Sequence, residues 1–201
     1  MVEVNPYMDR VYQELLRFGP VPEAEWEKAC REPFERLHLN KGGYFVRIGD
    51  IPNKMGFIWS GLFRVFYQTE QGNERILVFR GENRFLAAFS AFLEGQPSWY
   101  GIQALESSLL LCMDINKYKQ LVAEHPYWSQ FSRKYVESIF VEKEKREREF
   151  LSESAETRYL NFRKNYPDIE SRVPQYQIAS YLGITPVALS RIRKTLREKN
   201  L

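Results

Sequence analysis

Four polar side chains of the kind that contact nucleic acids lie close together near the C-terminal end of the sequence. They are Ser190, Arg191, Arg193 and Lys194, within the run "SRIRK". A guanidinium can donate two parallel hydrogen bonds to a guanine edge, and hydroxyl, guanidinium and ammonium groups can hold phosphates. We expect Arg191 to contact a base, and Ser190, Arg193 and Lys194 to contact phosphates.

The positive charge of the chain is concentrated in the same region. The whole sequence carries a formal net charge of +3. Residues 171–201 hold six basic residues and one acidic residue, a net charge of +5 that leaves −2 on the other 170 residues. A basic end on a mildly acidic body is typical of proteins that bind a polyphosphate, although a solvated basic helix would show the same charge.

The residues before this run predict two helices joined by a tight turn. Gly183 suits the left-handed conformation that ends a helix, and Thr185 and Pro186 suit the N-cap and first turn of the next one. Ala179, four residues before the glycine, and Leu189, six residues after it, would pack the two helices together. This spacing predicts a helix-turn-helix. We expect DNA contacts from Thr185, Pro186, Val187, Ser190, Arg191, Arg193 and Lys194. An ordinary helical hairpin has less reason to carry a basic outer face.

The region from about residue 42 to 113 has the character of an antiparallel sheet. Short runs rich in aromatic and β-branched residues are separated by turn sequences such as Gly-Asp, Ser-Gly and Gln-Gly-Asn. Runs of this length and spacing predict an antiparallel sandwich or barrel. Residues 62–68 and 75–79, joined across "TEQGNE", predict a hairpin.

Helices are expected on both sides of this region. Apolar residues at three- and four-residue spacing predict helix over 7–37, and a long helix over about 127–152. Phe131, Tyr135 and Ile139 mark the apolar side of the long helix, and residues 142–149 are all charged. This helix is either a solvated one with ion pairs along it or one that pairs with its twin in a dimer.

The remaining composition excludes several kinds of site. The two cysteines, Cys30 and Cys112, lack metal-ligand spacing, and the only histidines, His38 and His125, offer little for catalysis or haem ligation. We therefore expect no enzyme activity, no metal and no cofactor. Without a signal peptide or a membrane-spanning run, we expect a cytoplasmic protein.

Taken together, these segments resemble the Crp/Fnr family of bacterial transcription regulators. "VPQYQIASYLGITPVALSRIRK" is similar to the DNA-binding helix pair of that family, and residues 49–85 with "EGQPS" are similar to its cyclic-nucleotide-binding-like jelly-roll. The resemblance implies an α+β fold with an N-terminal antiparallel β-roll in residues 1–126, a dimerisation helix in 127–152 and a helix-turn-helix domain in 153–201. It also implies a homodimer on an inverted-repeat DNA site, with RNA polymerase and an unidentified small effector as further partners.

The sequence departs from the nucleotide-binding members of this family. Those members carry a Gly-Glu pair before a short helix and an arginine after a turn, which hold the ribose and the cyclic phosphate. Anchoring on "EGQ" places these slots near Ala87, Ala88 and Ser98. A buried phosphate without a cation would be strongly destabilised, so we expect no cyclic nucleotide. The candidate effector pocket, either filled by its own aromatic rings or open to an apolar molecule, comprises Phe85, Ala87, Ala88, Ser98 and Trp99.

A second departure lies in the recognition helix. Many relatives carry Arg-Glu where this chain has Pro186 and Val187, so its DNA site should differ from theirs. The β-hairpin wing that often follows this helix is expected to be missing or vestigial. The alternative function is a small-molecule sensor module whose helix pair binds a protein, and the basic face at residues 190–194 favours DNA instead.

Overall fold

The computed structural model describes residues 6–31 and 34–199. The described part leaves out residues 1–5 and 32–33 of the predicted β-roll domain and residues 200–201 of the predicted helix-turn-helix domain. The chain forms two compact units, Met1–Val65 with Phe79–Ile139, and Phe66–Val78 with Phe140–Leu201. These units follow a different division of the chain from the predicted one, and the predicted domain boundaries at 126 and 152 stay predictions.

The N-terminal part is helical only in pieces, so the predicted helix over 7–37 is wrong. The structure has α1 (Pro6–Leu16) and α2 (Glu23–Arg31), followed by β1 (Glu35–Leu39). Pro20 and Pro22 lie between the two helices, where they cannot donate the backbone hydrogen bonds of a continuous helix. The buried side chains of Met8, Val11 and Leu15 confirm the apolar face expected of the first helix.

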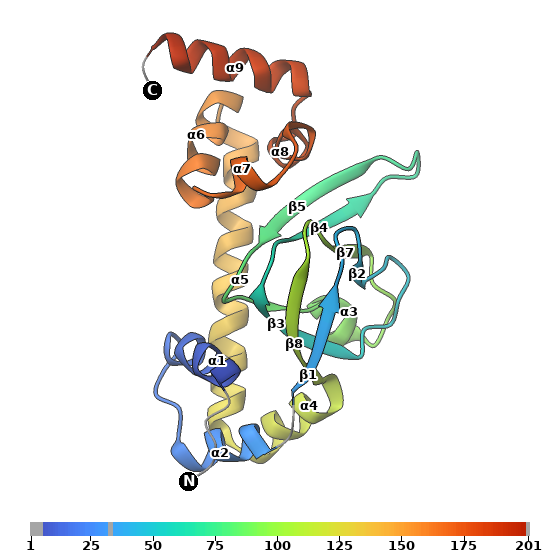
Figure 1. The fold of residues 1–201 in the computed structure, drawn as a ribbon, viewed down its shortest axis with the longest axis vertical. Helices are drawn as coiled ribbons and strands as arrows, with labels where there is room; N and C mark the ends of the chain where they lie inside the picture. The colour runs from blue at the N-terminus through green and yellow to red at the C-terminus, as the bar shows by residue number, and fades with distance from the viewer. Residues whose placement is uncertain (1–5, 32–33, 200–201) are drawn as a thin grey trace. The chain divides into compact units, whose positions relative to one another are not determined.

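The β-roll consists of two four-stranded sheets (Figure 1). The first has the order β1-β8-β3-β6, with the printed pairs antiparallel. The second has the order β2-β7-β4-β5. The strands not yet placed are β2 (Tyr44–Val46), β3 (Lys54–Ser60), β4 (Phe63–Gln68), β5 (Glu74–Arg80), β6 (Phe85–Leu86), β7 (Tyr100–Ala104) and β8 (Ser108–Asp114). The predicted β-roll is confirmed, as is the neighbouring position of the two strands expected to form a hairpin.

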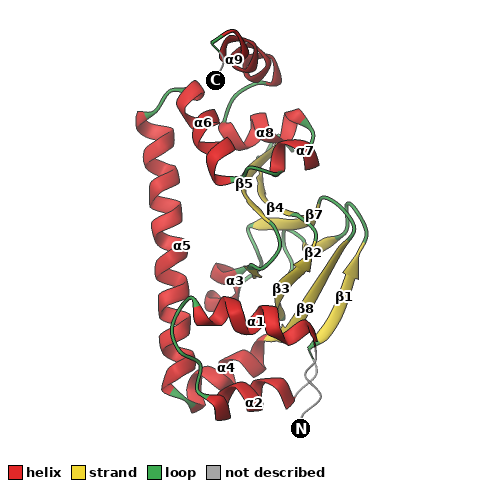
Figure 2. Cartoon of the chain, turned by 60° about the vertical axis from the view of Figure 1, so that its left-hand side comes forward, coloured by secondary structure: helices red, strands yellow, loops and turns green. Residues whose placement is uncertain are grey.

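The first sheet buries apolar side chains on both of its faces. In β8, Leu110 and Leu111 point to opposite faces, and both are buried. On the Leu111 face, Phe57 and the helical residues Val11, Leu121 and Trp128 belong to one apolar core. Here α1 contacts β3, and α4 (Ile115–Glu124) contacts β8 (Figure 2). The sheet therefore has one face toward the interior of the roll and the other covered by helices.

The remaining helices complete the chain. The short α3 (Phe89–Glu94) lies in the roll, and the long helix predicted over 127–152 is α5 (Pro126–Ser152). The second unit contains the end of α5 and the helices α6 (Ala155–Asn165), α7 (Ile169–Arg172), α8 (Gln175–Leu182) and α9 (Pro186–Glu198). Helix α9 ends at Glu198 and Lys199 is the last residue that the structure describes, so the expected lack of a wing stays a prediction. None of the described helices is both long enough and apolar enough to span a bilayer.

Candidate nucleic-acid interface

The turn between α8 and α9 has the local structure that the sequence predicts. Gly183 has a φ of 69°, and the hydroxyl of Thr185 accepts a hydrogen bond from the amide of Ala188 at 3.1 Å. Pro186 begins α9, where its missing N–H costs nothing. A Cβ atom added to Gly183 would lie 2.6 Å from the ring of Phe150. The glycine is therefore required both for the backbone conformation and for the close approach of α5.

Two arginines that the sequence reasoning missed satisfy the C-terminal end of α8. Arg146 donates to the carbonyl of Tyr181 at 2.6 Å, and Arg158 donates to the carbonyl of Leu182 at 3.2 Å. The last carbonyls of a helix lack intrahelical partners, so these bonds fix the end from which the turn departs. No sequence spacing indicates these contacts, since the arginines come from α5 and α6.

The side of α8 is also held by the strand β5 within the same compact unit. The Ser180 hydroxyl donates to the carbonyl of Glu74, and it accepts from the amide of Ile76, both at 3.2 Å. Arg146 contacts the carbonyl of Ile76 as well, at 3.3 Å. Helix α8 is thus anchored on polar backbone groups of β5, in addition to its apolar packing.

The second helix presents two different faces. Leu189 and Leu196 are buried, and they lie two helical turns apart on the inner face of α9. Val187, Ser190, Arg191 and Lys194 are exposed, at the spacing i, i+3, i+4 and i+7 that places them along one outer stripe. We call these four residues the outer stripe. The structure therefore brings together four of the seven residues for which we predict DNA contacts, with Thr185 and Pro186 at the start of the same helix.

Arg193 lies on the inner side of α9. Its guanidinium donates to Glu170 at 2.8 Å and to the hydroxyl of Tyr159 at 3.1 Å, and this hydroxyl in turn lies 2.5 Å from Glu170. Burial and the hydrogen bond to Glu170 raise the pKa of Tyr159, so the hydroxyl stays protonated and can donate. The predicted phosphate contact of Arg193 stays a prediction, while the structure gives this residue a role in tying α9 to α6 and α7.

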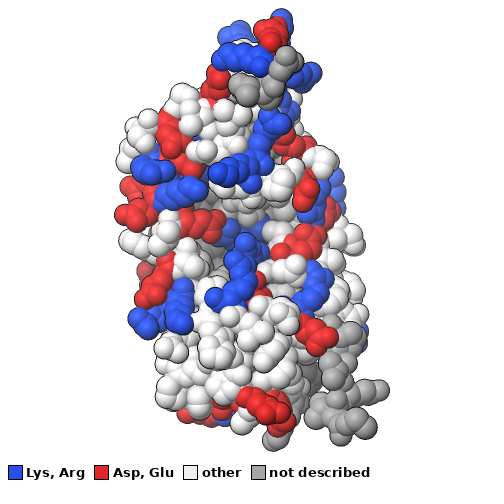
Figure 3. Space-filling view, turned by 90° about the vertical axis from the view of Figure 1, so that its left-hand side faces the viewer, with Lys and Arg blue, Asp and Glu red and all other residues white. Residues whose placement is uncertain are grey.

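Helix α9 is mainly basic, with Arg191, Arg193, Lys194 and Arg197 against Glu198. Figure 3 shows mostly Lys and Arg among the charged side chains at the end of the chain that α9 forms. Lys194 lies 3.9 Å from Glu198 in an exposed ion pair, which contributes little in water. Its ammonium therefore stays available to an anionic partner. Among the described residues no group of three or more His, Cys, Asp or Glu side chains could hold a metal ion.

The candidate effector residues are not all in one place. Ala88 and Ser98 are buried, whereas Trp99 is 74% exposed. Ala88 is the N-cap of α3, so the two slots assigned near Ala87 and Ala88 directly precede the short helix, and Ser98 follows it. The Ser98 hydroxyl donates to the carbonyl of Tyr100 at 2.8 Å. Phe85 lines a different cavity, on the helix-covered face of the first sheet.

The β-roll contains a buried cation, Arg64, that the sequence reasoning did not identify. Arg64 in β4 is buried, and its Nε donates to Gln103 of β7 at 2.9 Å. Gln103 lies between Ile102 and Ala104, which are fully buried, and side chains alternate along a strand. Arg64 therefore shares the face opposite to Ile102 and Ala104, away from the interior of the roll.

The predicted dimer residues are only partly available on α5. Phe131 is buried and Tyr135 is half-buried, and the hydroxyl of Tyr135 donates to the carbonyl of Phe85 at 3.1 Å. Further along α5, Phe140 is 64% and Leu151 is 81% exposed. These two lie three helical turns apart on one side of the helix. The exposed apolar side chains of α5 therefore lie nearer its C-terminal end than the predicted Phe131, Tyr135 and Ile139.

Comparisons with known proteins agree with this architecture. Residues 36–125 match the family model of the cyclic nucleotide-binding domain. The c-di-GMP-responsive global regulator CLP of Xanthomonas campestris is 13% identical with a TM-score of 0.71, over 90% of this chain and 94% of its own. A Crp/Fnr-family regulator of Eubacterium rectale also has a TM-score of 0.71, at 15% identity, over 91% of this chain and 88% of its own.

The catabolite activator protein of Thermus thermophilus is 19% identical with a TM-score of 0.57, over 93% of this chain and 88% of its own. No curated protein matches the sequence. At these identities the structural likeness shows the fold.

Proposed function

We propose that this chain is a sequence-specific DNA-binding transcription regulator. Its residues 36–125 match the cyclic nucleotide-binding domain family, and its fold is that of the Crp/Fnr regulators. It works in the cytoplasm and performs no catalysis. The observation that carries this proposal is the outer stripe of α9, whose exposed Val187, Ser190, Arg191 and Lys194 face away from the packed core. A helix with this face fits the major groove of B-DNA.

The contacts expected from this face differ in kind. Arg191 reaches a guanine edge with two parallel hydrogen bonds, and Lys194 and Ser190 hold phosphates. The amides at the start of α9, after Thr185, point toward a phosphate as well. Val187 has no polar atom in its side chain, so it contributes an apolar contact, for which a thymine methyl is the natural partner.

The regulator acts as a homodimer through α5. Phe140 and Leu151 are the exposed apolar positions on one side of this helix, and their burial against a second copy removes apolar surface from water. Two recognition helices related by a two-fold axis would meet successive major grooves. The DNA site is then an inverted repeat with half-site centres about 34 Å apart.

The sensor domain does not bind a cyclic nucleotide. Ala88 and Ser98 stand where the ribose and phosphate contacts of nucleotide-binding members are expected, and neither side chain carries a charge. The buried Arg64 points away from the interior of the roll, so it does not supply the missing cation. A buried phosphate would stay uncompensated, at a cost of several kcal/mol.

The test is selection of genomic fragments by the purified full-length protein at moderate salt. We expect enriched fragments to share an inverted repeat and to bind two chains. The same selection with added cyclic nucleotide should recover the same fragments with unchanged affinity. Recovery of fragments without a shared sequence contradicts the proposal, and it would favour a helix pair that binds protein.

A further inference from the structure

An apolar cavity lies on the helix-covered face of the first sheet, outside the β-roll interior. Its volume is about 50 Å³, and its lining holds no charged side chain among the described residues. The walls come from β3, β6 and β8 on one side and from α1, α2, α4 and α5 on the other. Residues that matter below are Ala29, Met55, Phe85, Leu111, Met113 and Phe131.

The polar tips of two lining residues are already bonded elsewhere. The hydroxyl of Tyr118 is hydrogen-bonded to Ser132, and the indole N–H of Trp128 donates to Glu25 at 2.7 Å. Only their rings therefore face the cavity. A site of this kind offers water no partners, and apolar cavities stay dry and take up apolar guests.

Two of the walls can adapt to a guest. Met55 and Met113 are half-buried, and their unbranched thioether side chains change rotamer easily to fit neighbouring groups. The other walls are largely aromatic rings, which pack edge to face around Phe131 and Phe85. Such a lining favours a guest of a few apolar atoms over a polar molecule, because a volume of about 50 Å³ is well below the roughly 150 Å³ of a cavity that takes up benzene.

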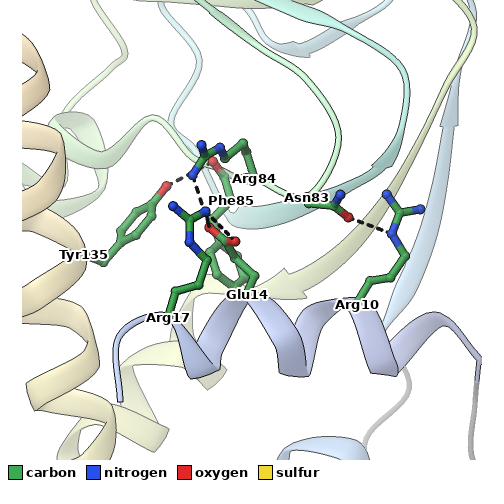
Figure 4. A network of polar contacts seen from close by, with 7 residues as sticks. All are labelled: Arg10, Glu14, Arg17, Asn83, Arg84, Phe85 and Tyr135. Carbon is green, nitrogen blue, oxygen red and sulfur yellow. Dashed lines mark hydrogen bonds and ion pairs between the residues drawn. The ribbon is translucent and has the colours of Figure 1, made fainter. Parts of the chain in front are cut away.

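The cavity has a direct connection to α5. The ring of Phe85 lies 5.7 Å from the rings of both Phe131 and Tyr135, and the carbonyl of Phe85 accepts the hydrogen bond from Tyr135. Next to Phe85, Arg84 lies 3.5 Å from the buried carboxylate of Glu14 on α1 (Figure 4). A guest that displaces Phe85 therefore moves a residue bonded to α5, directly next to the residue that pairs with α1.

From these observations we infer that the cavity is a binding site for a small apolar effector, whose occupancy changes the packing of α5 against the β-roll. The site lies on the opposite face of the first sheet from the roll interior. The binding site stands independently of the proposed function. Only the step from α5 to DNA affinity rests on that function.

Methionine methyl groups provide the probe for binding. The chain has four methionines; Met55 and Met113 line the cavity, and Met8 is buried but does not. We expect xenon to shift the methyl ¹³C signals of Met55 and Met113 saturably and to leave that of Met8 in place. The Ala29→Val variant, which adds two methyl groups to the wall, should lose the shift. Equal and unsaturable shifts at all three methyl groups, or a shift retained in Ala29→Val, overturn the site.

A pair of neighbouring truncations in β8 controls for nonspecific softening. Leu111→Ala enlarges the cavity, whereas Leu110→Ala opens space on the other face of the same strand. We expect benzene to shift the Met55 and Met113 signals in Leu111→Ala and to leave them unshifted in Leu110→Ala. The same response in both variants contradicts the assignment of the site.

The effector role is tested by two measurements on the full chain with the same benzene concentration. In Leu111→Ala, benzene should change amide exchange in residues 126–139 of α5 at least several-fold, and the Leu110→Ala protein should show no such change. It should also change the affinity for a selected DNA fragment in the Leu111→Ala protein alone. Binding that leaves exchange in α5 unchanged overturns the effector role. A third outcome separates the two proposals. If benzene changes amide exchange in α5 but the protein prefers no DNA fragment even without benzene, the proposed function fails and the apolar binding site remains.

Discussion

Arg193 donates to Glu170 at 2.8 Å, while Arg191, two residues earlier on the same helix, is exposed on the opposite side. The two arginines therefore provide a matched pair for separating DNA recognition from folding. Successive residues turn by about 100° on a helix, so a separation of two places them on different faces. This difference underlies the predictions for the DNA interface.

Replacement of Arg191 should relax sequence preference. We expect Arg191→Ala to lose about 1–3 kcal/mol of binding to the selected DNA site, with a much smaller loss on bulk DNA. Arg193→Ala serves as the control, and it should lower the melting temperature because Glu170 and Tyr159 lose the guanidinium that ties them to α9. Fluorescence anisotropy on both DNAs and thermal unfolding provide the measurements. A stable Arg193→Ala protein that alone loses sequence preference would reverse the two roles.

Replacement of Lys194 should act on all sequences alike. Its ammonium is exposed and is expected to hold a phosphate, so Lys194→Ala weakens specific and bulk binding by the same factor. The slope of log K against log salt should fall by about 1. Titrations at several salt concentrations measure this slope. An unchanged slope would show that Lys194 contacts no phosphate.

Substitution of Gly183 should destabilise the helix-turn-helix. In Gly183→Ala, the left-handed backbone conformation should lower the free energy of unfolding by about 1–2 kcal/mol. The shift needed to avoid the clash between the new Cβ and the ring of Phe150 should lower it by ~1–3 kcal/mol more. The matched control is Gly72→Ala, because Gly72 also has a positive φ but has open space around it. Denaturant unfolding compares the two proteins. Equal losses of stability would show that the ring of Phe150 imposes no constraint.

The exposed apolar positions on α5 should control association. We expect Leu151→Asp to convert a dimer to a monomer, since it places a charge in the middle of a buried apolar contact. Ile51→Asp changes a residue of similar exposure, 68%, on the β-roll, and it should leave the dimer intact. Sedimentation velocity at several concentrations distinguishes the two states. A Leu151→Asp protein that stays dimeric would move the interface away from this side of α5.

Local sequence signals predicted the parts of the fold that depend on neighbouring residues. Gly183, Thr185 and Pro186 fix the turn by their own backbone and capping properties, and the structure has the turn where they indicate it. The strand β1 was missed because Leu37 and Leu39 alternate over too short a run to stand out beside a helix. The break between α1 and α2 was also missed, although Pro20 and Pro22 are the local signal for it.

Tertiary partners explain what the sequence did not predict. Arg193 lies four residues after the buried Leu189, which is a helical signal for the inner face, but its partner Glu170 comes from another helix. The burial of Phe131 depends on which side of α5 the β-roll covers. The anchoring of α8 by Ser180 depends on a strand more than one hundred residues earlier in the chain. Spacing within one helix carries no information about such partners.

The central claim is that the outer stripe of α9 recognises a specific DNA sequence. The most direct measurement is the ratio of affinities for a selected genomic fragment and for a scrambled fragment of the same length and composition, at one moderate salt concentration. The account predicts a ratio of about 10³ or more for the native protein and a sharply reduced ratio for Arg191→Ala. A ratio near one for the native protein would contradict it.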